Sequence, residues 1–325
     1  MVSPWVGECP GGMAGKYTMS AMTGVCAVRE MYVETPAGRI AVQDYGGSGV
    51  DVLFVHSLGF CGPQWRLLAE AVADRCRPVS FDLPGHGHTS VPLREADDLW
   101  RCLAEVIEGA GLERPVVVAH DMAVWPAMVT GVVHADLVRA LVLVGGSMAR
   151  TLEGRGLLAD PDLRRALVER FRVGATGRGV EAARELQREL VARVSEDWML
   201  SGLESGFGAE IEHSIVFGAD GRWVNTPTVE TMENAFRFDG PSSLAPSPEL
   251  YAQLWVPTWL VGLSEGFDGN LLDAGRDLSE RYPQISVRLL MSGQWPQYTA
   301  VPELAEVVGS VIRQVAVGER ASGSR

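Results

Sequence analysis

The sequence is almost without lysine and carries few positive charges. Lys16 is its single lysine, and 28 lysine and arginine residues stand against 41 aspartate and glutamate residues, for a formal net charge of −13. A surface this acidic repels phosphate groups, so neither nucleic acid nor an anionic membrane is expected as a partner. Arginine supplies nearly every positive charge, which we interpret as the codon bias of a high-GC genome.

Cysteine and long apolar runs are also scarce. The five cysteines form no Cys-x-x-Cys pair and show no His/Cys ligand spacing, so we expect free thiols in a reducing cytoplasm, with neither a disulfide framework nor a metal site. No apolar run approaches the roughly 18 residues that a membrane span needs. The first 30 residues lack a basic start followed by an apolar stretch, so they are predicted to be a loose extension and not a secretion signal.

Alternating strands and helices are what the sequence does contain. Short β-branched runs such as residues 116–118 predict strands buried on both faces. Their alternation with helical segments over residues 31–146 and 246–318 predicts an α/β fold with a doubly wound, mostly parallel sheet. Residues 147–245 are Arg/Glu-rich, helical in period and without a buried strand, which predicts an inserted helical cap. Residues 319–325 are predicted to be a flexible tail.

One strand leads directly into a tight turn between small residues. Residues 116–118 are followed by Ala119-His-Asp-Met-Ala123, and an apolar helical pattern then runs to about Val133. A strand, a tight turn and a helix form the geometry of a nucleophile elbow, where the central residue stands on a strained corner above the sheet. The central residue here is Asp121. The pattern therefore predicts a carboxylate at the tip of a catalytic corner.

These motifs, taken in order over residues 31–317, resemble the α/β-hydrolase superfamily. Residues 55–59 are similar to its oxyanion loop, and residues 82–89 to the turn after the next strand. Glu265 stands at the usual site of the triad acid, and residues 292–298 resemble the loop that carries the catalytic histidine. An aspartate at the elbow points to the branch that holds haloalkane dehalogenases, fluoroacetate dehalogenases and epoxide hydrolases.

Several residues of that branch are missing. Gln294 stands where the family carries its catalytic histidine, and no histidine follows the last predicted strand. Leu58 and Met122 occupy the positions of the halide-binding Asn and Trp, and residues 147–245 contain no tyrosine to bind an epoxide. A glutamine amide cannot accept a proton from water. Ordinary ester hydrolysis is therefore disfavoured, unless a cap base such as His213 replaces the histidine.

The resemblance and the departures together imply a cofactor-independent, non-hydrolytic enzyme that acts on a bulky, hydrophobic aromatic molecule. Asp121 would transfer a proton, the backbone N–H groups of Leu58 and Met122 would stabilise an oxyanion, and Gln294 would orient substrate oxygens. Carbon–carbon bond formation, cyclisation or rearrangement would fit this chemistry. The fold and the disabled triad also resemble tailoring enzymes of aromatic polyketide and anthraquinone-fused enediyne pathways. Further residues expected at the substrate site are Ser57, Trp125, Trp198, His213, Trp223, Glu265 and Trp295.

Two other functions stay open. One is an epoxide hydrolase or dehalogenase with a displaced base, and the other is a non-catalytic ligand-binding protein of the same fold. The sequence does not indicate an oligomeric state.

Overall fold

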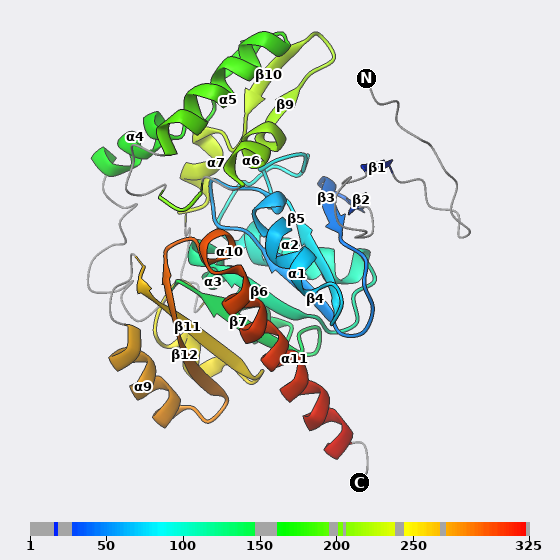
Figure 1. The fold of residues 1–325 in the computed structure, drawn as a ribbon, viewed down its shortest axis with the longest axis vertical. Coiled ribbons are helices and arrows are strands. Elements are labelled where there is room, and N and C mark those ends of the chain that lie inside the picture. Colours follow the sequence, from blue (N-terminus) through cyan, green and yellow to red (C-terminus); the bar gives the residue numbers. More distant parts are fainter. Residues whose placement is uncertain are drawn as a thin grey trace.

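A nine-stranded sheet forms the centre of the computed structural model (Figure 1), which describes residues 16–18, 28–146, 161–194, 201–203, 206–237, 244–266 and 271–322. The strand order is β1-β2-β3-β5-β4-β6-β7-β11-β12. From β5 to β12 all neighbours pair in parallel, and β1, β2 and β3 add an antiparallel edge. The predicted mostly parallel sheet is confirmed. Its strands are β1 (Lys16–Thr18), β2 (Val28–Thr35), β3 (Gly38–Asp44), β4 (Asp51–Val55), β5 (Arg77–Phe81), β6 (Val116–His120), β7 (Ala140–Val144), β11 (Thr258–Glu265) and β12 (Ile285–Gly293).

Helices cover both faces of this sheet. Side chains alternate along a strand, so Leu53 and Val55 of β4 join the apolar cluster under α2 and α3, while Val52 and Phe54 join the cluster under α1 and α11. Burial on both faces explains why these strands are continuous apolar runs. None of the described helices combines the length and the apolarity needed to cross a membrane. The core helices are η1 (Gly62–Trp65), α1 (Arg66–Val72), α2 (Asp97–Gly109), η2 (Asp121–Ala123), α3 (Val124–Val133), α8 (Leu250–Gln253), α9 (Leu271–Arg281), α10 (Pro296–Thr299) and α11 (Val301–Ser322).

The described helices and strands between β7 and α8 build a cap, which gathers at one end of the molecule in Figure 1. The expectation of a purely helical cap is wrong, because β8, β10 and β9 form a three-stranded antiparallel sheet within it. These strands have only three or four residues, too few to show a period of two against helical surroundings. The cap elements are α4 (Pro161–Arg170), β8 (Thr176–Arg178), α5 (Val180–Val194), α6 (Phe207–Ser214), β9 (Ile215–Phe217), β10 (Arg222–Asn225) and α7 (Val229–Asn234).

An apolar cluster holds the cap on the core. Phe60, from the loop after β4, and Trp295 and Tyr298, from the segment after β12, pack with buried side chains of α5 and α6. The rings of Phe60 and Trp295 are 4.7 Å apart between centroids. The cap therefore lies over the loops at the carboxyl ends of the core strands, where ligands bind in open α/β sheets.

The two chain ends differ from their predictions. Regular structure was expected from Met31, but β2 begins at Val28 and pairs with β1, where Lys16 lies opposite Glu30. A three-residue edge strand has too little alternation to be predicted from sequence. The remainder of residues 1–30 lies outside the described residues. At the other end, α11 continues to Ser322 and so includes part of the predicted tail.

Candidate active site

Asp121 occupies the corner between β6 and α3 in a strained backbone conformation. Its φ is +52°, a region that residues other than glycine seldom adopt and that is typical of functional sites. Gly146, just after β7, makes room for this corner, because a Cβ added there would lie 2.4 Å from the Asp121 carbonyl oxygen. The predicted elbow geometry is present, with a carboxylate at its tip.

Ser57 holds one oxygen of the Asp121 carboxylate. The Ser57 hydroxyl donates to Asp121 Oδ2 at 2.7 Å, and the Ser57 backbone N–H donates to Gln64 Oε1 at 3.1 Å. Ser57 is buried, whereas Asp121 is half-buried. Within the described parts of the chain, Ser57 is the only hydrogen-bond partner of this carboxylate. Its second oxygen remains available to solvent or substrate.

Two buried histidines brace the loop that contains Ser57. His56 Nε2 accepts the Leu83 N–H at 2.9 Å, which leaves the hydrogen on Nδ1 to be donated to the Ser57 carbonyl at 2.9 Å. His86 Nε2 accepts the Gly59 N–H at 3.2 Å. Burial lowers the pKa of His56 to about 4 and that of His86 to about 3. Both rings are therefore neutral near pH 7 and serve to position the loop.

The hydrogen bond between Ser57 and Asp121 also brings together the two backbone segments predicted to form an oxyanion hole. Leu58 follows Ser57, and Met122 follows Asp121, so the contact between Ser57 and Asp121 places both segments at one point. Met122 lies in the first turn of η2, where backbone N–H groups have no acceptor within the helix. The role of the Leu58 and Met122 N–H groups in binding an oxyanion stays a prediction.

Gln294 reaches the elbow through its backbone. It directly follows β12, and its carbonyl oxygen accepts a hydrogen bond from His120 Nε2 at 2.8 Å. His120 ends β6, immediately before Asp121, and its ring lies 5.4 Å from that of Trp295. Burial lowers the pKa of His120, so its ring is neutral. His120 therefore links the elbow to the loop where the family carries its base.

No histidine hydrogen-bonds the Asp121 carboxylate, although the neighbouring His120 interacts with its charge. All six histidines of the chain lie in described segments, and none of them hydrogen-bonds that carboxylate. His213, considered above as a cap base that could replace the histidine, donates from Nε2 to Asp82 Oδ2 at 2.7 Å. The sequence could not indicate this pairing, because it does not show which core residue α6 meets. The elbow thus has a carboxylate but no imidazole to activate water.

Asp82 is an organising residue that the sequence alone did not reveal. It is buried and accepts the Gly62 N–H at 2.7 Å and the His88 N–H at 2.8 Å, in addition to His213. Burial acts to raise the pKa of Asp82, but its contacts with His213, His56 and the Gly62 N–H together lower it to about 2. The family resemblance marked this aspartate only as the start of a turn.

The predicted tryptophans are packed into the structure. The Trp125 indole N–H donates to the Leu244 carbonyl at 2.7 Å, and its ring lies in the core cluster under α2 and α3. The Trp223 N–H donates to the Gly179 carbonyl at 3.2 Å, inside the cap. Trp295 belongs to the cluster between cap and core. These contacts give Trp125 and Trp223 structural roles, and their part in lining the substrate site stays a prediction.

Glu265 and Trp198 are the other two residues predicted at the substrate site. Glu265 is exposed at the end of β11 and has no side-chain partner within the described residues. Its predicted contact with substrate stays a prediction. Trp198 lies outside the described residues.

A small cavity of about 30 Å³ lies between the loop after β4 and the cap. Residues 59–61 and Glu210 line it, but Asp121 does not. Glu210 is buried with both carboxylate oxygens unpartnered, and burial raises its pKa well above the usual range, so the group is neutral. A cavity of this size with a polar lining can hold water.

Comparison with known proteins identifies the family. A model of the α/β-hydrolase fold matches residues 52–244, more than half of the chain. The chain belongs to the α/β-hydrolase fold family. Solved relatives agree: a thioesterase domain from the curacin biosynthetic pathway superposes with a TM-score of 0.65 at 18% identity, covering 87% of this chain and 99% of that one. An E-2-(acetamidomethylene)succinate hydrolase gives 0.66 at 15% identity, over 88% and 99%. Identities this low show a shared fold only.

Similarity to curated proteins is partial. A pimeloyl-(acyl-carrier protein) methyl ester esterase of Vibrio cholerae is 28% identical over 125 residues, which are 38% of this α/β-hydrolase-fold chain and 48% of the esterase. A dihydrolipoyllysine-residue acetyltransferase component of the acetoin cleaving system of Cupriavidus necator is 29% identical over 98 residues, 30% of this chain and 26% of that protein. The matches span less than half the length of either relative, so neither activity transfers directly.

Proposed function

We propose that this protein is a cofactor-independent acid–base enzyme of the α/β-hydrolase fold, in which Asp121 transfers a proton to or from the substrate. One observation carries the proposal. Asp121 stands at φ +52° on the elbow with one oxygen bound by Ser57, and no histidine is hydrogen-bonded to it within the described residues. A carboxylate in this position keeps a free oxygen that can take a proton.

Covalent hydrolysis at this elbow would need a second step that no described residue supports. If Asp121 attacked a substrate carbon, the resulting ester would have to be cleaved by an activated water. His213 is bound to Asp82, and His120 is bound to the Gln294 backbone. An ester on Asp121 would therefore persist, which favours reversible proton transfer over hydrolysis.

In the proposed reaction Asp121 removes a proton from a carbon or a hydroxyl group, and negative charge develops on a substrate oxygen. The backbone N–H groups of Leu58 and Met122 are the candidate donors to that oxygen. The Gln294 amide would orient a second polar group. A stabilised enolate or phenolate can then form a carbon–carbon bond, cyclise or rearrange without a cofactor. The bulky aromatic, polyketide- or enediyne-type substrate expected from the sequence remains a prediction.

Hydrolysis is the second candidate function, favoured by similarity to an esterase over 125 residues. It requires that water be activated by a group other than an elbow-bound histidine. A trapped ester distinguishes the two: covalent hydrolysis passes through an adduct on Asp121, and proton transfer does not.

The test compares the wild type with Asp121→Asn and Gln294→His on panels of epoxides, haloalkanes, esters and enolisable aromatic ketones. Asp121→Asn should lower turnover of the accepted substrate about 10²–10⁴-fold, because the amide cannot take a proton. Gln294→His should impair that reaction and add little hydrolysis. Glu265→Gln serves as the matched control.

Intact-protein mass spectrometry provides the contradicting outcome. An ester found on Asp121 of the wild type but absent from Gln294→His would overturn the proposal in favour of hydrolysis. Full turnover by Asp121→Asn would show that the Asp121 carboxylate is not the reacting group, and absence of turnover by the wild type on every panel would leave the ligand-binding alternative.

A further inference from the structure

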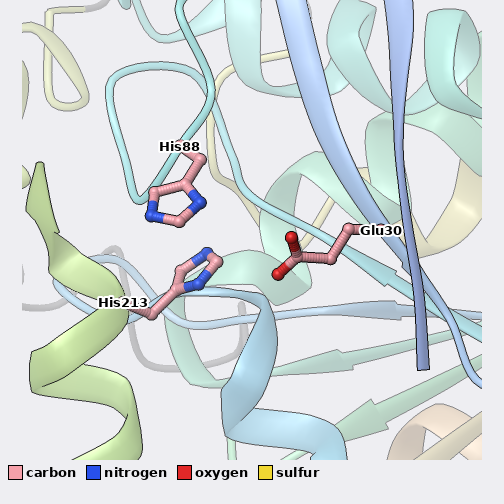
Figure 2. A group of neighbouring side chains, drawn as sticks. All are labelled: Glu30, His88 and His213. Carbon is pink, nitrogen blue, oxygen red and sulfur yellow. The ribbon is translucent and has the colours of Figure 1, made fainter. Parts of the chain in front are cut away.

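Two histidines and a glutamate from three distant parts of the sequence meet at the junction of core and cap. Figure 2 shows Glu30 on β2, His88 in the loop after β5 and His213 on α6, with the Glu30 carboxylate directed toward the two rings. One ligand atom from each residue lies within 4.8 Å of the other two. The rings of His88 and His213 stack with centroids 4.0 Å apart and planes inclined by 30°. Glu30 is exposed, so solvent can reach the group.

Asp82 orients His213 in the way that a carboxylate orients a metal-binding histidine. An ionised carboxylate only accepts hydrogen bonds, so the 2.7 Å contact places the hydrogen on His213 Nε2. When the ring is neutral, Nδ1 carries the lone pair. Metal-binding histidines characteristically donate their other N–H to such a carboxylate, which sets the tautomer and the ring orientation. Asp82 is itself held by two backbone N–H groups, so it supplies a rigid support.

The loop that carries His88 is equally constrained. The His88 N–H donates to Asp82 Oδ2 at 2.8 Å, and the Thr89 hydroxyl donates to the Asp82 carbonyl at 2.6 Å. Gly87 has a φ of +47°, and a Cβ there would lie 2.3 Å from Asp82 Oδ2. The His88 side chain has no hydrogen-bond partner within the described segments, so its imidazole is available to a ligand.

We propose that Glu30, His88 and His213 bind a divalent transition-metal ion such as Zn²⁺, which links the cap to the core. Two imidazoles and one carboxylate are ligands that Zn²⁺ prefers, and a water would complete a tetrahedral site. Ligand atoms around a tetrahedral Zn²⁺ lie about 3.3 Å apart, given bonds of about 2.0–2.2 Å. The ligand atoms, which lie within 4.8 Å of one another, must therefore approach by up to about 1.5 Å. Rotation of the exposed Glu30 and of the His88 side chain can provide this while Asp82 holds His213. The sequence expectation of no metal site rested on local spacing, which cannot detect residues this far apart.

The test measures ion binding by the full chain after chelator treatment and removal of any purification tag. Isothermal titration with Zn²⁺ should give one ion per chain, and Co²⁺ should produce the visible absorption of a tetrahedral complex. Saturating Zn²⁺ should raise the melting temperature by several degrees, since the ion binds only the folded arrangement. His88→Ala should weaken binding at least 100-fold and Glu30→Gln about tenfold.

Two matched controls separate this site from adventitious surface binding. Glu34→Gln removes an exposed glutamate from the same strand as Glu30, and His134→Ala removes a half-buried histidine outside the group. Both should bind like the wild type. His213→Ala also loses its contact with Asp82, so circular dichroism must first show that it folds; His88→Ala and Glu30→Gln decide the question if it does not. Failure of the wild type to bind Zn²⁺ or Co²⁺ at 100 µM of either ion, or undiminished binding by His88→Ala, would overturn the proposal.

Discussion

The loop after β6 and the loop after β12 meet through one hydrogen bond, yet they retain different parts of the family's chemistry. The first keeps the strained corner, where Asp121 has a φ of +52°. Gly146 leaves space for this corner, and Ser57 is the polar partner of the Asp121 carboxylate. The second keeps its structural contacts, since the Gln294 carbonyl binds His120 and Trp295 packs under the cap. Gln294 stands where the resemblance predicts a histidine. A strained corner is costly to maintain, so its presence at Asp121 is consistent with the proposed proton transfer.

The largest effect should come from filling the space under the elbow. Gly146→Ala places a Cβ 2.4 Å from the Asp121 carbonyl, where backbone cannot move aside easily. We expect a loss of at least about 3 kcal/mol in the free energy of unfolding, together with loss of activity. Chemical denaturation of the variant measures the former.

Gly293→Ala is the matched control for that variant. It lies at the end of β12, and a Cβ there would meet nothing within 4 Å. Its free energy of unfolding should stay close to that of the wild type. Equal losses at the two glycines would show that the elbow is no more constrained than the loop after β12.

Acid should lower the stability of the folded protein through His56, which braces the loop that contains Ser57. Burial lowers the pKa of His56 from 6.5 to about 4, so between these values the unfolded chain binds a proton that the folded protein does not. Stability should therefore be complete above pH 6.5 and fall as the pH drops to about 4, by up to about 3 kcal/mol from this group. Denaturation curves at a series of pH values measure the slope. His56→Asn, which does not titrate, should reduce that slope; an unchanged slope would mean that other groups cause the acid sensitivity.

Ser57→Ala tests the polar partner of the elbow and should have a moderate effect. It removes the 2.7 Å hydrogen bond to Asp121 Oδ2, but the half-buried carboxylate can bind water in exchange. We expect about 1 kcal/mol less stability and about a tenfold lower turnover. A loss as large as that of Asp121→Asn would instead give the Ser57 hydroxyl a direct chemical role.

Glu265→Gln should have the smallest effect. The residue is exposed at the end of β11, at the position where family members carry the acid that supports the histidine. Stability should change by less than about 0.5 kcal/mol, and turnover should not change. A clear loss of turnover would show that this acid still serves the site and would weaken the contrast between the two loops.

The sequence by itself determined the fold class, because strands buried on both faces must be continuous apolar runs and because a strand, small residues and a helix follow one another locally at Asp121. Such signals lie within about ten residues of each other. The absence of a histidine at position 294 was equally plain. The cap's short sheet escaped detection, since three-residue strands carry no measurable period.

Only the tertiary structure decided which side chains meet across long separations. His213 could have faced Asp121, but the docking of α6 on the core directs it to Asp82. Trp125 stands four residues from the elbow tip and yet points into the core, where its N–H binds the Leu244 carbonyl. The group of Glu30, His88 and His213 exists only because an edge strand, a loop and a cap helix converge. Periodicity reports which face of an element is buried, whereas packing between elements selects the partner that each buried side chain finds.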